Sequence, residues 1–108
     1  MTSKKGYIYA ELDVTDSDYF NREYAPRVEP VLKKFDARFL VSGGSPEVRE
    51  GERRVKRVVL LEFPSPELAQ EFYDSREYQE VIAYRLKSAR THLYLLEGTE
   101  HGGAAVLQ

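Results

Sequence analysis

The sequence contains no cysteine and no tryptophan among its 108 residues. Without cysteine the chain can form no disulfide, offers no thiolate nucleophile and cannot bind a metal through sulfur. A cysteine-free composition is consistent with a reducing compartment, and we therefore expect a cytoplasmic location.

The chain also lacks an excess of charge of either sign and any long apolar run. It has 16 lysines and arginines against 18 aspartates and glutamates, which gives a formal charge of −2 at pH 7. Such a balance creates no basic field that would attract nucleic acid or anionic lipid. No segment approaches the roughly 20 apolar residues of a membrane span, and the first residues show no signal-peptide pattern. We expect neither nucleic acid nor a membrane as a partner.

Four segments have the pattern or composition of β-strands. Apolar and polar residues alternate over residues 6–14, which is the two-residue period of a strand. Residues 37–42, 56–63 and 92–97 are rich in β-branched, aromatic and aliphatic residues, as strands are. The polar segment 45–54 lacks apolar periodicity and predicts a loop.

Two longer segments, residues 15–36 and 64–89, repeat their apolar residues at helical spacing. Thr15 or Asp16 can cap the first helix. Two prolines inside it, at positions 26 and 30, predict a kink or two abutting helices.

The second helical segment has its own start signals. Ser65 is placed as an N-cap, with Pro66 at the first helical position, where a missing N–H is tolerated. Ser75 can cap a second helical piece that follows within the same segment.

The order of these elements, βαββαβ, is that of a ferredoxin-like α+β fold, an antiparallel four-stranded sheet with both helices on one face. A chain of this length forms one domain. We assign that domain to residues 1–98 and expect residues 99–108, which show little pattern, to form a flexible tail.

The strand alternation sorts the sheet residues into two faces. One set is almost purely apolar and is expected under the helices: Ile8, Ala10, Leu12, Val14, Phe39, Val41, Val59, Leu61, Phe63, Leu93 and Leu95. The other set is mixed: Tyr7, Tyr9, Glu11, Arg38, Leu40, Ser42, Val58, Leu60, Glu62, His92, Tyr94 and Leu96. This mixed face is too apolar to stay against water and too polar for a dry core. We therefore predict a homodimer whose two sheets face each other and enclose a polar pocket.

Four segments within residues 6–98 form a specific combination: GYIYAELDVTDSDYFNREYA, RFLVSGGSPEVREG, RVVLLEFPSPELAQEFYDSREYQEVIAYR and LYLLEG. Together they resemble one known family, the domain of unknown function 1330, in the dimeric α+β barrel superfamily. The resemblance implies a small homodimer with a ferredoxin-like fold and no established activity. The wider superfamily includes cofactor-free monooxygenases and isomerases, although a shared fold does not transfer chemistry.

The glycine pair Gly43-Gly44 follows the second predicted strand. A phosphate-binding loop would need a helix directly after these glycines, and the sequence predicts none there. The pair therefore indicates a turn with positive φ or a bulge that ends the strand. The alternative is that Ser42, Gly43 and Gly44 let a ligand approach the backbone.

The mixed face suggests a catalytic or binding cluster. Arg38 could hold a substrate carboxylate in a bidentate fork, and a desolvated Glu62 or Glu11 could act as a general base. Tyr9 would form one wall of such a pocket. The alternative is a salt-bridge network that satisfies a dimer interface, because interior carboxylates need partners in either case.

The break between the two pieces of the second helical segment could present hydroxyl groups to the same pocket. Ser75 is the predicted helix cap, but it could also contact a ligand. Tyr73 and Tyr78 suit either packing with a polar tip or binding. Arg85 follows on the same helix and could contact an acidic partner, a role that the family resemblance supports.

The remaining polar residues do not form a recognisable metal site or catalytic triad. Two histidines, His92 and His101, are too few for the three or four ligands that a metal needs. We therefore predict neither metal nor cofactor. The favoured hypothesis is a homodimeric protein that binds a small polar or aromatic molecule and could act on it by acid–base chemistry. The rival hypothesis is a non-catalytic module for dimerisation or protein interaction.

Overall fold

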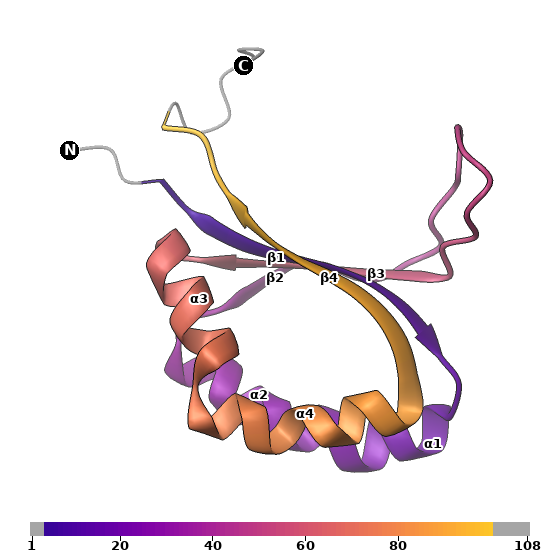
Figure 1. Ribbon diagram of the computed structural model, residues 1–108, viewed down its shortest axis with the longest axis horizontal. Helices are drawn as coiled ribbons and strands as arrows, with labels where there is room; N and C mark the ends of the chain where they lie inside the picture. The colour runs from indigo at the N-terminus through magenta and orange to yellow at the C-terminus, as the bar shows by residue number, and fades with distance from the viewer. Residues whose placement is uncertain (1–3, 101–108) are drawn as a thin grey trace.

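The computed structural model describes residues 4–100, which fold into one sheet covered on one side by helices (Figure 1). Most of the predicted flexible tail and His101 lie outside the described residues. The elements in chain order are β1 (Gly6–Val14), α1 (Ser17–Tyr19), the π-helix η1 (Phe20–Tyr24), α2 (Ala25–Lys34), β2 (Arg38–Gly43), β3 (Arg57–Phe63), α3 (Pro66–Asp74), α4 (Arg76–Ser88) and β4 (Ala89–Glu97).

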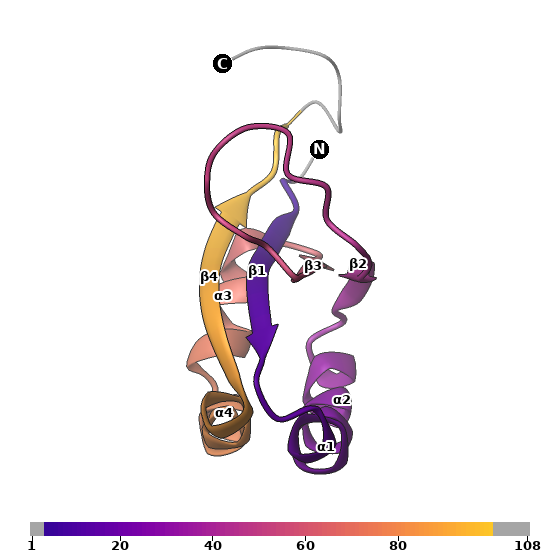
Figure 2. The same cartoon turned by 90° about the vertical axis from the view of Figure 1, so that its right-hand side faces the viewer.

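The four strands lie in the order β2-β3-β1-β4, and every neighbouring pair is antiparallel. Both helical segments pack on the same side of this sheet, which Figures 1 and 2 show from two directions. We call the side under the helices the inner face and the opposite side the outer face. The predicted ferredoxin-like α+β fold is confirmed. No helix within residues 4–100 is both long and apolar enough to cross a membrane.

The predicted helix starts are also confirmed. Asp16, rather than Thr15, caps the first helical segment, where its carboxylate accepts the backbone N–H of Tyr19 at 3.1 Å. The hydroxyls of Ser65 and Ser75 accept backbone N–H groups three residues ahead of each, both at 3.1 Å. Each cap satisfies a donor that the first helical turn leaves free.

A π-helical turn precedes the prolines of the first helical segment. The backbone N–H of Ala25 donates to the carbonyl of Phe20, five residues back, while Pro26 and Pro30 both lie within α2. A proline has no N–H to donate to the preceding turn. Helical residues continue from α1 through η1 into α2, so the predicted break takes the form of a π turn instead.

The core forms where the central strands meet the helices. Ile8, Leu61, Phe63 and Phe72 are nearly inaccessible to water. Strand β1 passes so close to the start of α3 that a Cβ added at Gly6 would lie 2.4 Å from the carbonyl oxygen of Ser65. Glycine is the residue that permits this approach.

The second strand departs from the predicted alternation. The pairing of β2 with β3 shifts between Phe39 and Val41, so that Val41 pairs with Leu60 and Ser42 pairs with Val59. The bulge reverses the side chains that follow it. Val41 therefore belongs to the outer face and Ser42 to the inner face, the opposite of the prediction.

The edges of the inner face are less covered than predicted. Phe39 is 56% exposed and Leu95 is 44% exposed. Strands β2 and β4 are the two edges of the sheet, and α3 and α4 pack mainly against β1, β3 and β4. The inner face is therefore open to solvent along the β2 side.

Candidate functional site

The layer between the sheet and the helices contains a cavity of about 470 Å³. Its walls are mostly apolar and come from all four strands and from the helices: Ile8, Ala10, Leu12, Phe20, Ala25, Val28, Leu32, Ala37, Phe39, Val59, Leu61, Phe72 and Leu93. A close-packed protein interior has few voids larger than a water molecule. A cavity of this size within a 108-residue domain is therefore a candidate ligand site.

The π turn contributes two of the aromatic walls. Phe20 and Tyr24 are the first and last residues of η1, and both line the cavity. Their rings contact each other with centroids 5.1 Å apart. Single π turns inside α-helices occur frequently at functional sites, and this one lies directly beside the cavity.

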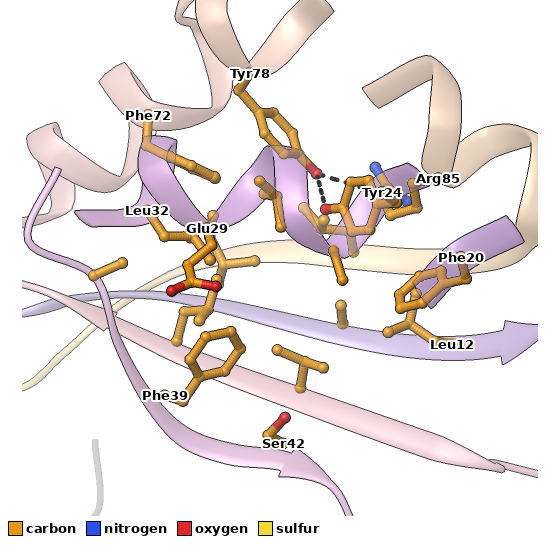
Figure 3. A pocket seen from close by; sticks show the side chains of 18 of the residues that line it. Leu12, Phe20, Tyr24, Glu29, Leu32, Phe39, Ser42, Phe72, Tyr78 and Arg85 are labelled. Carbon is orange, nitrogen blue, oxygen red and sulfur yellow. Dashed lines mark hydrogen bonds between the residues drawn. The ribbon is translucent and has the colours of Figure 1, made fainter. Parts of the chain in front are cut away.

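Three polar side chains meet on the helix side of the cavity (Figure 3). The hydroxyls of Tyr24 and Tyr78 are hydrogen-bonded at 3.0 Å, and Arg85 donates through Nε to the hydroxyl oxygen of Tyr78 at 3.3 Å. Tyr78 and Arg85 lie two turns apart on α4, while Tyr24 comes from η1. All three line the cavity, and we call them the Tyr24–Tyr78–Arg85 cluster.

Arg85 is an unusual residue for this position, because it is only 5% exposed. No carboxylate of residues 4–100 lies within 4.0 Å of its guanidinium group. The titratable groups that act on it are the hydroxyls of Tyr24, Tyr73 and Tyr78. Burial lowers the pKa of Arg85, but these hydroxyls raise it by more, so the side chain is positively charged. Burial also raises the pKa of Tyr24 well above its usual range, which keeps its phenol protonated.

A second arginine reaches the cavity from the sheet. Arg57, at the start of β3, has its guanidinium carbon 5.4 Å from the centre of the Phe20 ring. Its Nε is buried and has no hydrogen-bond partner among the described residues. Ser42 also lines the cavity from the sheet side, where Figure 3 shows it beside Phe39.

The rim of the cavity carries one pair of opposite charges. Glu29 and Lys33, one turn apart on α2, form an ion pair of 3.2 Å and both line the opening. Both side chains are largely exposed, so this pair contributes little to stability. The two charges of this pair cancel, so Arg57 and Arg85 supply the net charge of the cavity lining.

The carboxylates predicted as catalytic lie on the outer face, on the other side of the sheet. The hydroxyl of Tyr7 donates to Glu62 at 3.1 Å, and Arg38 lies 3.6 Å from the same carboxylate. Desolvation and the Glu62 carboxylate raise the pKa of Tyr7. This grouping matches the salt-bridge alternative for Arg38 and Glu62.

Glu11 has a similar environment further along the outer face. It accepts a hydrogen bond from the Tyr9 hydroxyl at 3.1 Å and forms an ion pair with Arg53 of the β2–β3 loop. Desolvation and the Glu11 carboxylate raise the pKa of Tyr9. Glu11 and His92 also line a smaller hollow of about 340 Å³ beside this loop. The catalytic roles of Glu11 and Glu62 stay predictions, and neither residue reaches the larger cavity.

The other predicted site residues fall in several places. Ser42, Tyr78 and Arg85 line the cavity, although Ser42 was predicted for the opposite face. The ring of Tyr73 packs at a tilt against that of Tyr78, with ring centroids 5.6 Å apart. Ser75 caps α4 and also donates its hydroxyl to the carbonyl of Phe72 at 2.7 Å.

The glycine pair has the predicted positive φ angles at the end of β2. Gly43 has φ 83° and Gly44 has φ 72°, the left-handed region that glycine adopts without steric cost. No helix follows within residues 45–56, so the loop lacks the helix N-terminus that a phosphate-binding motif requires. A Cβ at position 43 would lie 3.8 Å from Nε of Arg57.

Besides the Glu29–Lys33 pair at the rim, the cavity contains two polar residues that were not among the predicted site residues, Tyr24 and Arg57. Both had a usable signal. Tyr24 lies at helical spacing from Phe20 and Val28, which predicts that it faces the sheet. Arg57 precedes Val59, Leu61 and Phe63 in the alternation, which places its charge on the otherwise apolar inner face. Within residues 4–100 no group of three histidines, aspartates or glutamates could hold a metal ion.

The family model described as domain of unknown function DUF1330 matches residues 5–99. The chain belongs to the DUF1330 family. This confirms the resemblance that the sequence segments indicated and extends it by one residue at each end. No curated protein has a matching sequence.

Solved structures with a similar fold include proteins from Rhodopseudomonas palustris and Bacteroides thetaiotaomicron. The RPA0582 protein of unknown function from Rhodopseudomonas palustris has a TM-score of 0.72 at 14% identity, covering 90% of this DUF1330 chain and 84% of that one. A methylated form of RPA0582 gives a TM-score of 0.71 at 14% identity, with 90% and 82% covered. A conserved protein of unknown function from Bacteroides thetaiotaomicron, described as a possible oxidoreductase, has a TM-score of 0.50 at 8% identity, with 90% and 99% covered. At these identities the likenesses show the fold alone.

Proposed function

We propose that this protein binds a small, largely apolar molecule in the cavity between its sheet and its helices. The observation that carries the proposal is the cavity of about 470 Å³ with apolar walls and a few convergent polar groups. Ligand sites for small molecules typically enclose about 300–1,000 Å³ and have this kind of lining. The opening beside β2, where Phe39 is exposed, provides a route of entry.

The cavity is a better candidate than the outer face for this role. On the outer face Glu62 and Glu11 already have partners within the chain, namely Tyr7 and Arg38 for one and Tyr9 and Arg53 for the other. The polar groups of the cavity include the guanidinium of Arg85, which has no carboxylate partner within residues 4–100. Because the raised pKa of Tyr24 keeps it protonated, the cavity offers hydrogen-bond donors rather than a general base.

A neutral fluorescent probe tests the proposal. N-phenyl-1-naphthylamine is apolar, and its fluorescence increases strongly in an apolar environment. We therefore expect a saturable increase in fluorescence when it binds the wild-type protein. The variant Val59→Phe adds a ring to the cavity wall and is expected to weaken binding at least about tenfold, equivalent to about 1.4 kcal/mol. The control is Val48→Phe, the same substitution in the exposed β2–β3 loop, with circular dichroism confirming that both variants fold.

Two results would contradict the proposal. Equal affinity of the probe for Val59→Phe and wild type would place the bound probe outside the cavity. No saturable binding to the wild-type protein would show that the cavity does not accept an apolar molecule of this size.

We also propose that the outer face is the interface of a homodimer. Its apolar and aromatic members include Tyr94 and Leu96, which are 45% and 47% exposed in the single chain, and Tyr9 stacks on Tyr94 with ring centroids 6.2 Å apart. The carboxylates on this face are paired within the chain, so a second copy could cover them without leaving a charge unpaired. A two-fold symmetric contact places the same patch on both subunits. If the protein is a monomer in solution, the rival hypothesis of a surface for another protein gains support.

The proposed setting is the cytoplasm. The composition supports it, because a chain without cysteine needs no oxidising compartment in order to fold. Fractionation of cells that express the full chain with an epitope tag tests this location. Recovery with periplasmic, secreted or membrane fractions would contradict it.

A further inference from the structure

We infer that the ligand of the cavity is an anion, an apolar molecule with a carboxylate that Arg85 binds together with a tyrosine hydroxyl. The inference rests on the proposed function and adds the charge of the ligand and the residue that selects it. Three observations carry it: the burial of Arg85, the donors that its surroundings leave free, and the second arginine on the opposite wall.

Arg85 carries a buried positive charge that no carboxylate among the described residues neutralises. Arg85 is only 5% exposed, whereas the ion pairs formed within residues 4–100 lie at the surface or on the outer face. A buried charge is costly unless it is paired. The groups that face Arg85 from η1, α3 and α4 are the hydroxyls of three tyrosines. A ligand carboxylate would supply the counter-charge that the protein does not.

The hydrogen bonds of the Tyr24–Tyr78–Arg85 cluster leave donors for such a ligand. A guanidinium group has five N–H donors in a planar fork, and the bond from Nε to Tyr78 uses one of them. The two tyrosines have two hydroxyl protons, of which one lies in the bond between them. The other proton can be donated to the ligand. A carboxylate accepts bidentate bonds from an arginine and a further bond from a hydroxyl.

Arg57 adds positive charge from the sheet side of the same cavity. Its Nε is buried without a partner among the described residues, and like Arg85 it has no carboxylate within 4.0 Å in residues 4–100. Lys33 and Glu29 balance each other at the rim. The cavity is therefore positive although the whole chain has a formal charge of −2. A positive, apolar cavity favours an anion with an apolar body over a neutral or cationic molecule.

The test compares two ligands of almost the same shape that differ in charge. Isothermal titration calorimetry with the full-length protein measures the affinities of naphthalene-2-carboxylate and naphthalene-2-carboxamide. We expect the wild-type protein to bind the carboxylate at least about tenfold more tightly. The variant Arg85→Met should lose this preference while keeping its affinity for the carboxamide within about twofold. Arg85→Lys should retain part of the preference, because it keeps the charge but not the planar fork.

The matched control is Arg76→Met, the same substitution on the same helix at a side chain that is 90% exposed. It should leave the preference unchanged. Equal affinities of the wild-type protein for the two compounds would overturn the inference and leave the proposed function standing. Binding of neither compound would contradict both. If Arg85→Met does not fold, the wild-type comparison and Arg85→Lys still decide the outcome.

Discussion

The Nε of Arg85 donates a hydrogen bond to the hydroxyl of Tyr78 over 3.3 Å, in the layer between the sheet and the helices. A tyrosine fixes the direction of a guanidinium group but does not neutralise it. Buried arginines that serve only structure are normally paired with carboxylates. This pairing with a neutral hydroxyl is what an anion-binding group needs, because the side chain is held in place and its charge is still available.

Replacement of Arg85 by methionine should separate stability from binding. Methionine fills a similar volume and removes a buried charge that has no carboxylate partner. We expect the free energy of unfolding of Arg85→Met to be unchanged or to rise by up to about 1 kcal/mol, as measured by urea denaturation. A loss of about 2 kcal/mol or more would instead indicate that Arg85 is a structural residue, with Arg76→Met as the control.

Alanine at Gly6 should destabilise the fold through a backbone clash. A Cβ there would lie 2.4 Å from the Ser65 carbonyl oxygen and 2.6 Å from Cα of Pro66, neither of which can rotate away. We expect a loss of about 2–3 kcal/mol in the free energy of unfolding. Gly44→Ala is the comparison, since its Cβ would meet no atom within 4 Å and its positive φ alone should cost about 1 kcal/mol. The reverse order of the two losses would contradict the close approach of β1 to α3.

Tyr24 should make the protein sensitive to alkali. Burial, with Tyr78 beside it, raises its pKa in the folded state above the usual value of 10.0, whereas the unfolded chain loses the proton near that value. Its contribution to stability is therefore complete below pH 10 and declines as the pH rises above it. Urea denaturation from about pH 9 to about pH 11.5 should show a shallower decline for Tyr24→Phe than for wild type. If the free energy of unfolding declined equally with pH in both proteins, folding would not raise the pKa of Tyr24.

A charge at the centre of the outer face should dissociate the proposed dimer. Leu60 pairs with Tyr9 on one side and with Val41 on the other, so it lies in the middle of this face. We expect the wild-type protein to sediment as a dimer at micromolar concentration and Leu60→Glu to sediment as a monomer. Leu86→Glu, at a position on α4 that is 64% exposed, should remain a dimer. A monomeric wild type would contradict the dimer proposal directly.

The fold was predictable because each element has a local signal. The two-residue alternation in β1 correctly places Ile8, Ala10 and Leu12 under the helices, and serine side chains cap α3 and α4 as their positions predict. The reversal of Val41 and Ser42 was not predictable in the same way. A bulge depends on how β2 pairs with β3, and that pairing is a tertiary property that the RFLVSGG segment does not reveal.

The candidate site was only partly predictable, for a different reason. Alternation reports which side chains face inward, but it does not report that the sheet and the helices leave a cavity between them. Selecting polar residues on the sheet led to Glu62 and Arg38, because polar groups are most frequent on the face away from the core. The polar residues of the cavity, such as Arg57, stand singly among apolar neighbours. A single charged residue at an inward-facing strand position, such as Arg57, was a stronger indication of the site than the polar residues of the outer face.

A crystal structure with naphthalene-2-carboxylate tests the central claim most directly. We predict that the naphthalene rings lie between Phe20 and the inner face of the sheet, with the carboxylate oxygens within about 3.0 Å of the Arg85 guanidinium nitrogens. A carboxylate found instead at Arg38 on the outer face, with the cavity between the layers unfilled, would contradict it.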